Sequence, residues 1–337
     1  MIGAYFNSII ANFVKAVATK YLAVAHVTSP YVTIYEIDAG VFTKITNPAT
    51  LPRGIGRGVS FSADGKYLAV AHSTSPNVTI YEIDAGVFTK ITNPATLPTG
   101  AGQGASFSAN GQYLAVAHST SPFVTIYEID AGVFTKITNP ATLPTGIGAS
   151  ASFSADGQYL AVGHATSPFV TIYEIDAGVF TKITNPATLP TGAGQGVSFS
   201  ADGQYLAVAH SFSPFVSIYE IDAGVFTKIT NPATLPASTG RGASFSADGK
   251  YLAVAHFTSP FVTIYEIDAG VFTKITNPAT LPASTGRGAS FSADGQYLAV
   301  AHSNSPFVTI YEIVGGVFTK ITNPATLPAG TGFGASF

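Results

Sequence analysis

The chain has 337 residues, of which 46% are hydrophobic and only 10% are charged, whereas about 25% is usual for a soluble domain. Its formal net charge of −3 leaves no basic field for a phosphate backbone, so we expect no nucleic-acid partner. The absence of cysteine excludes disulfides, thiolate metal sites and thiol nucleophiles. No segment approaches the ~20 uninterrupted apolar residues that span a bilayer, which argues against a membrane partner.

The first 19 residues differ from everything that follows. Their apolar residues recur with the spacing of an amphipathic helix. The candidate assembly residues on its apolar face are Ile2, Phe6, Ile9, Ile10 and Phe13. Three interpretations are open: a helix that covers a face of the same chain, a helix for assembly or a membrane surface, and a secretion signal. Ala16-Val17-Ala18 favours the signal, but a basic segment before the apolar stretch is lacking.

Residues 20–337 form one array of seven repeats. The histidines mark the period, because each follows the last by 46 residues without insertion. They are His26, His72, His118, His164, His210, His256 and His302. The array is therefore one domain, although the chain length alone would suggest about two.

Each repeat contains four strand-like runs. In the unit that starts at residue 58 they are GVSF (58–61), YLAVAH (67–72), NVTIYEID (77–84) and VFTKIT (87–92). Turn residues such as Asp-Gly, Ala-Gly and Asn-Pro separate them. Both faces of the second run are apolar, because successive side chains of a strand point to opposite faces. We therefore predict a small four-stranded antiparallel sheet that is covered on both sides.

Four short strands in 40–45 residues, repeated in tandem, are typical of a β-propeller blade. The sequence predicts an all-β, single seven-bladed propeller with a short N-terminal amphipathic helix. The segment FSADGKYLAVA resembles the strand–turn–strand of the WD-repeat and TolB-like propeller families, although the Trp-Asp pair is absent. The near-identical units, of the form YLAVAH-xTSPxVTIYE, also resemble propellers of phages and bacteria. This second resemblance implies a virion-associated or cell-surface role.

The two ends of the array are complementary. The chain ends in GASF (334–337), which is the first strand of a unit whose remainder is missing, while the first unit lacks that strand. We expect residues 334–337 to supply the inner strand of the blade formed by residues 21–46. Such closure leaves no open sheet edge.

The recurring polar residues predict neither a metal site nor a catalytic site. One histidine per blade does not provide the clustered ligands that zinc needs, so we interpret the histidines as structural and expect no metal and no cofactor. Glu82 and Asp84 recur in almost every blade, whereas glycoside hydrolysis needs one carboxylate pair across a cleft. We expect them to form cross-strand charge pairs with Lys90 instead, and we predict no catalytic residue.

The differences between the repeats are more informative. They fall after the histidine, at the start of the third strand and before the first strand. An up-and-down blade places the loop between its second and third strands and the crossing to the next blade on one face of the disc. This face carries aromatics and all four arginines, which are residue types enriched at interfaces. The binding-face candidates are Arg53, Arg57, Phe212, Arg241, Phe257, Arg287 and Phe333. The alternative explanation of the same pattern is sequence drift at loop positions that tolerate substitution.

These observations predict a non-enzymatic scaffold for protein–protein interaction or self-assembly. The resemblance to phage and bacterial propellers implies a location outside the cell, at a cell surface or in a virion, rather than in the cytoplasm. The alternative is a glycan-binding propeller, or a propeller enzyme that uses the central channel or the clefts between blades. A unique constellation would indicate an enzyme, whereas the same pocket in every blade would indicate a lectin.

Overall fold

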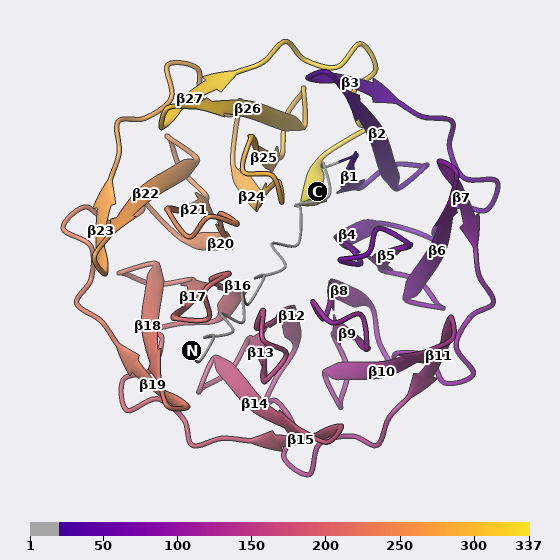
Figure 1. Cartoon of the computed structure of the whole chain (residues 1–337), viewed down its shortest axis with the longest axis horizontal. Helices are drawn as coiled ribbons and strands as arrows, with labels where there is room; N and C mark the ends of the chain where they lie inside the picture. Colours follow the sequence, from indigo (N-terminus) through magenta and orange to yellow (C-terminus); the bar gives the residue numbers. More distant parts are fainter. Residues whose placement is uncertain (1–19) are drawn as a thin grey trace, which may run out of the picture.

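The computed structural model describes residues 20–337, which form 28 β-strands and no helix. The strands build seven four-stranded antiparallel sheets, which surround a central axis like blades (Figure 1). The predicted all-β, seven-bladed propeller is confirmed. The predicted helix and its candidates Ile2, Phe6, Ile9, Ile10 and Phe13 lie outside the described residues. Within the described part of the chain, no helix is present that could cross a membrane.

Each blade runs from an inner strand at the channel to an outer strand at the rim. Blade 1 consists of β28, β1, β2 and β3, and blades 2 to 7 follow as β4–β7, β8–β11, β12–β15, β16–β19, β20–β23 and β24–β27. The inner strands are β28 (Gly332–Ser336), β4 (Gly56–Phe61), β8 (Gly102–Phe107), β12 (Gly148–Phe153), β16 (Gly194–Phe199), β20 (Gly240–Phe245) and β24 (Gly286–Phe291). The second strands are β1 (Tyr21–His26), β5 (Tyr67–His72), β9 (Tyr113–His118), β13 (Tyr159–His164), β17 (Tyr205–His210), β21 (Tyr251–His256) and β25 (Tyr297–His302).

The third and fourth strands complete each sheet. The third strands are β2 (Val32–Asp38), β6 (Val78–Asp84), β10 (Val124–Asp130), β14 (Val170–Asp176), β18 (Val216–Asp222), β22 (Val262–Asp268) and β26 (Val308–Val314). The outer strands are β3 (Val41–Lys44), β7 (Val87–Lys90), β11 (Val133–Lys136), β15 (Val179–Lys182), β19 (Val225–Lys228), β23 (Val271–Lys274) and β27 (Val317–Lys320).

The hydrophobic core lies between neighbouring blades. In β5, Leu68 and Val70 join a buried cluster with blade 1, while Ala69 and Ala71 join the next cluster with blade 3. Both faces of each sheet are thus buried, as the apolar pattern predicts. The blades are further linked at their inner strands, where the Ser60 hydroxyl accepts a hydrogen bond from a backbone N–H of blade 3.

The ring closes between the two ends of the array. Strand β28 pairs with β1, with Val24 opposite Ala335 and Ala23 opposite Ser336. The Ser336 hydroxyl accepts a 3.4 Å hydrogen bond from the backbone N–H of Phe61 in blade 2. Blade 1 therefore has four strands, and its inner strand comes from the other end of the described chain.

The histidines are buried between strands. His72 is fully buried, and its Nε2 lies 2.9 Å from the Thr79 hydroxyl on the neighbouring strand. Burial lowers the pKa of His72 to about 4, so the imidazole is neutral at pH 7. The same contact, to a threonine or serine, recurs in every blade. In residues 20–337 no group of three or more metal-ligating side chains comes together.

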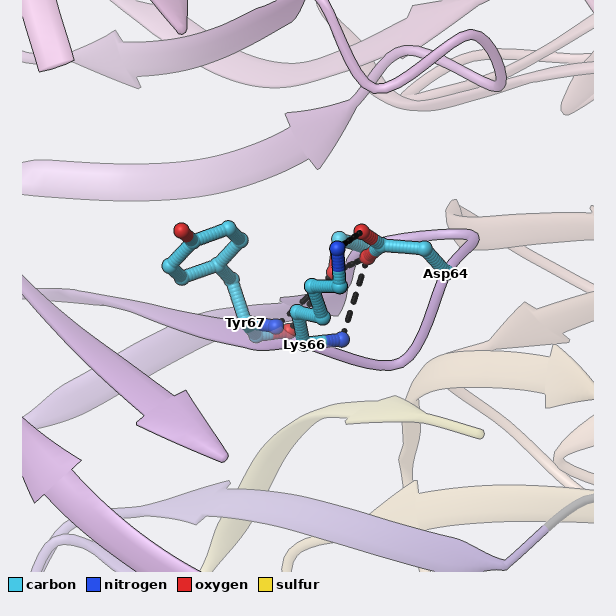
Figure 2. A network of polar contacts seen from close by, with 4 residues as sticks. Asp64, Lys66 and Tyr67 are labelled. Atoms are coloured by element: carbon cyan, nitrogen blue, oxygen red, sulfur yellow. Dashed lines mark hydrogen bonds and ion pairs between the residues drawn. The ribbon is translucent and has the colours of Figure 1, made fainter. Parts of the chain in front are cut away.

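The turn between the first two strands is fixed by one acidic side chain. In blade 2, Asp64 accepts hydrogen bonds from the Ser62 hydroxyl at 2.7 Å and from the backbone N–H of Lys66 at 3.0 Å. The Lys66 ammonium lies 3.6 Å from the same carboxylate, and Figure 2 shows this network. Burial alone would raise the pKa of Asp64. The hydrogen bonds and the nearby lysine together have the larger effect, so the net shift of the pKa is downward.

The expected charge pairs on the outer strands do not form. Lys90 lies opposite Tyr81, and Glu82 lies opposite Thr89, so the two charged residues stand at different levels on opposite faces of the sheet. Among the described residues the ion pairs are Lys20–Glu36, Lys66–Asp64 and Lys250–Asp248. The prediction of cross-strand pairing to Lys90 is therefore wrong.

Candidate functional site

A β-bulge at the start of each inner strand directs one side chain into the central channel. In blade 2, Gly56 pairs with His72 and Gly58 pairs with Ala71, which leaves Arg57 without a partner between them. Bulges of this kind re-aim a side chain and are frequent beside functional sites. The prediction that the variable positions precede the first strand is correct for Arg53 but wrong for Arg57 and the other bulge residues, because the strand already begins at Gly56.

The glycines on either side of the bulge allow close packing. A Cβ on Gly56 would lie 2.1 Å from the carbonyl oxygen of Tyr31, and a Cβ on Gly58 would lie 2.7 Å from the Cα of Gly104 in the next blade. The inner strands thus approach one another through glycine, and the residue between the two glycines remains free to vary without disturbing the ring.

The seven bulge residues form a ring that breaks the sevenfold repeat. In order around the channel they are Phe333, Arg57, Gln103, Ala149, Gln195, Arg241 and Arg287. Three arginines and one phenylalanine occupy one continuous arc, while two glutamines and an alanine occupy the other. This is the unique constellation that the near-identical strands conceal.

Within the arc, Phe333 lies between two guanidinium groups. The Cζ atoms of Arg287 and Arg57 are 4.6 and 5.6 Å from the centre of its ring, distances typical of cation–π contacts. The third arginine, Arg241, has its Cζ 5.6 Å from the ring of Phe257. The structure therefore brings together five of the seven binding-face candidates.

The arc concentrates positive charge in a small part of the channel wall. The Arg287 Nε donates to the Ser303 hydroxyl at 2.9 Å, whereas the Nε atoms of Arg57 and Arg241 are buried without a hydrogen-bond partner in the described structure. Burial, followed by the charges of Arg241 and Arg57, lowers the pKa of Arg287. The guanidinium group of Arg287 is thus close enough to those of Arg241 and Arg57 to be repelled by both, and an anion would relieve that repulsion.

The channel cavity has a volume of about 300 Å³ and contains no carboxylate or histidine in its lining. The topology explains this, because all 18 acidic residues lie in the first turn of a blade or towards the end of its third strand. Both positions belong to the opposite half of the disc from the bulges, which follow the crossing between blades. The cationic arc therefore faces no counter-charge across the channel.

The two remaining candidates lie outside the arc. Arg53 is exposed in the crossing that leads to blade 2 and lines a separate cavity. Phe212 is 66% exposed in the loop after β17. The ring residues Gln103 and Gln195 were not among the candidates, although their place between two glycines at the 46-residue period was visible in the sequence.

A family model described as "Lactonase, 7-bladed beta-propeller" matches residues 149–331, which is more than half of the chain. The chain belongs to this lactonase family. The propeller part of the expected resemblance is thereby supported, whereas the narrower resemblance to WD-repeat, TolB-like and phage propellers is not. No curated protein matches this chain significantly.

Solved structures share the fold of this lactonase-family chain at low sequence identity. A suggested 6-phosphogluconolactonase of Bacteroides fragilis is 17% identical, with a TM-score of 0.72 over 95% of this chain and 98% of that one. The periplasmic gluconolactonase of Pseudomonas aeruginosa is 19% identical, with a TM-score of 0.70 over 94% and 98%. A Lactobacillus plantarum protein is 20% identical, with a TM-score of 0.74 over 94% and 98%.

Family membership overturns the expected function. The sequence predicted a non-enzymatic scaffold and structural protein without catalytic residues, but the matching family and the named structural neighbours are lactonases and point to an enzyme. The prediction was wrong because it was based on residues that recur in every blade, among which no acid, base and nucleophile come together. The positions that differ between blades are instead single bulge residues on seven different strands.

Proposed function

We propose that the protein hydrolyses an anionic sugar lactone at the mouth of its central channel. The observation that carries the proposal is the arc of Arg57, Arg241 and Arg287 in a lactonase-family propeller, with no carboxylate in the channel lining. Guanidinium groups recognise phosphate and carboxylate through charge-assisted, often paired hydrogen bonds. The names of the two structural neighbours, a 6-phosphogluconolactonase and a gluconolactonase, support a lactone that is phosphorylated or yields a sugar acid.

The cavity suits a small ligand. Its volume of about 300 Å³ lies at the lower end of the range of ligand pockets. The arginine side supplies charge, Phe333 supplies an apolar ring face, and Gln103 and Gln195 across the channel supply amide groups for hydroxyls of a sugar. This division between a charged and a neutral arc orients a substrate that is anionic at one end only.

Lactone hydrolysis develops negative charge that the arginines can stabilise. Addition of water or hydroxide to the ring carbonyl places charge on its oxygen, and collapse of that intermediate breaks the ring C–O bond to leave a carboxylate and a hydroxyl group. Preorganised donors aimed at the developing oxyanion lower the barrier. The guanidinium groups of Arg57, Arg241 and Arg287, which line the cavity, supply donors of this kind.

The described lining of the channel offers no aspartate, glutamate or histidine as a general base. We therefore expect hydroxide to be the attacking species. The rate should rise with pH with a slope near one on logarithmic axes, without the bell shape that an acid–base pair produces.

The experiment compares hydrolysis of 6-phosphoglucono-δ-lactone and glucono-δ-lactone by the whole chain with hydrolysis in buffer. Replacing Arg57, Arg241 and Arg287 together by glutamine should abolish the acceleration of the phosphorylated lactone. The triple variant Lys136→Gln, Lys182→Gln and Lys274→Gln removes the same charge at the rim and should retain activity. Unaccelerated hydrolysis of both lactones by the wild-type protein, or full activity of the arginine variant, would contradict the proposal.

A further inference from the structure

Blade 2 departs from the repeat at a second cavity, separate from the channel. The cavity has a volume of about 500 Å³ and is lined by Arg53 of the crossing, Lys90 at the end of β7, and the hydroxyl-bearing Thr50, Ser75 and Thr92. It shares no lining residue with the channel cavity. Two cationic side chains thus line one concavity outside the candidate active site.

Arg53 has no counterpart in the other blades. The equivalent residues are Thr99, Thr145, Thr191, Ala237, Ala283 and Ala329. The next residue, Gly54, has a φ of +112°, whereas the glycines at the same place in two following crossings, Gly100 and Gly146, have no positive φ. This left-handed backbone is open to glycine but not to most residues. The crossing therefore takes a different path where it presents an arginine.

The second cation, Lys90, is also exceptional. In the six other blades the equivalent lysine donates from Nζ to the asparagine side chain three residues later, as Lys136 does to Asn139 at 2.7 Å. Among the described contacts Lys90 makes no such bond, and its Nζ donates to the carbonyl oxygen of Ile91 at 3.0 Å. Within residues 20–337 the Lys90 ammonium has no other hydrogen-bond partner.

The cavity contains no carboxylate, because the topology places all acidic residues in the other half of the disc. Two positive charges without a counter-charge, surrounded by hydroxyl groups, match the needs of a tetrahedral oxyanion. We propose that Arg53 and Lys90 form a second anion site in blade 2 that binds a phosphate group. The group is free inorganic phosphate or the phosphate of a small metabolite, since both offer the same oxygen atoms.

The site is tested apart from the channel by working in the Arg57→Gln, Arg241→Gln, Arg287→Gln background. Isothermal titration of that protein with inorganic phosphate should reveal one binding site. Arg53→Thr, which restores the residue of blades 3 to 5, should weaken binding at least tenfold, and so should Lys90→Gln. Lys136→Gln makes the same change in blade 3 and should leave the affinity unchanged.

A second titration with glucose 6-phosphate distinguishes the two sources of the phosphate group. Tighter binding of the sugar phosphate than of inorganic phosphate would identify a metabolite, and the reverse would identify the free ion. Absence of phosphate binding in the background variant, or equal affinity of the Arg53→Thr protein, would refute the second site. Neither result bears on lactone hydrolysis, because the channel arginines are absent from every protein compared.

Discussion

Ser150 stands directly opposite Gly163 in the sheet of blade 4. At the corresponding positions of the other six blades the pair is glycine and alanine, as with Gly104 and Ala117. A Cβ on Gly163 would lie 3.1 Å from the Ser150 hydroxyl oxygen. The serine side chain therefore takes the space that an alanine methyl group fills elsewhere, and the two exceptions to the repeat compensate for each other.

This compensation predicts strong coupling between the two positions. Gly163→Ala alone should lower the free energy of unfolding by about 1–2 kcal/mol, because the added methyl group overpacks the space beside Ser150. The double variant Ser150→Gly, Gly163→Ala should be at least as stable as the wild type, since it also removes a hydroxyl that is buried without a partner. Urea denaturation of the four proteins measures the coupling, and simple additivity would contradict it.

The cationic arc should cost stability when no anion is bound. Arg287→Gln removes one of three neighbouring guanidinium groups, so the free energy of unfolding at low salt should rise by no more than the ~1 kcal/mol typical of partly exposed charges. The melting temperature should therefore rise slightly. Added phosphate should stabilise the wild-type protein more than this variant. Lys182→Gln, which removes a rim charge, serves as the control. A lower melting temperature for Arg287→Gln at low salt would show that repulsion in the arc is not significant.

The buried histidines predict acid sensitivity. Burial lowers the pKa of each of the seven to about 4, against about 6.5 in an unfolded chain. The unfolded state therefore binds more protons between these values, so stability is full above pH ~6.5 and falls as the pH drops towards 4. Each histidine contributes on the order of 1–3 kcal/mol to this loss.

Melting temperatures between pH 7 and pH 4 measure this dependence. A variant with His118, His164 and His256 replaced by glutamine should show a shallower fall over the same range, because fewer groups take up protons on unfolding. An equal slope for the two proteins would assign the acid sensitivity to other groups.

The hairpin turns at the rim leave room for stabilisation. Ala85 and Gly86 form the two-residue connection between β6 and β7, and both have positive φ, 45° and 83°. Asparagine tolerates this conformation better than alanine, and Asn-Gly is the favoured pair in such turns. Ala85→Asn should raise the free energy of unfolding by about 0.5–1 kcal/mol. The same change at Ala131 should have the same effect, and a loss of stability at both sites would contradict the argument.

The fold was predictable from sequence because its determinants are repeated. The 46-residue period, the doubly apolar YLAVAH strand and the turn residues recur in each unit, so every unit adds evidence for the same blade. The cationic arc was harder to predict, because it depends on one residue from each of several blades. Its position in the channel is set by the bulge between Gly56 and Gly58, a backbone feature that leaves no periodic signal in side-chain polarity.

The placement of the charged side chains could not be predicted from the sequence pattern either. Lys90 and Glu82 lie close together along the chain, which suggested a pair, but the register places Lys90 opposite Tyr81. The ordering of strands then gathers the arginines in one half of the disc and the carboxylates in the other. A net charge of −3 therefore conceals two halves of opposite sign, and only the topology reveals where the positive charges gather.

The junction where β28 pairs with β1, here called the closing seam, should be the part of the ring most sensitive to truncation. Deleting residues 334–337 removes the pairing of Ala335 with Val24 and of Ser336 with Ala23, and it removes Phe337, which stacks on Tyr297 at 6.3 Å between ring centres. Blade 1 would be left with an unpaired edge facing the channel. We expect the melting temperature to fall by more than about 10 °C, because a loss of several kcal/mol has this effect in a domain of this size. Replacing the same four residues by the equivalent GVSF of blade 2 keeps the backbone pairing and should restore most of the stability, whereas an unchanged melting temperature after deletion would show that the seam does not hold the ring together.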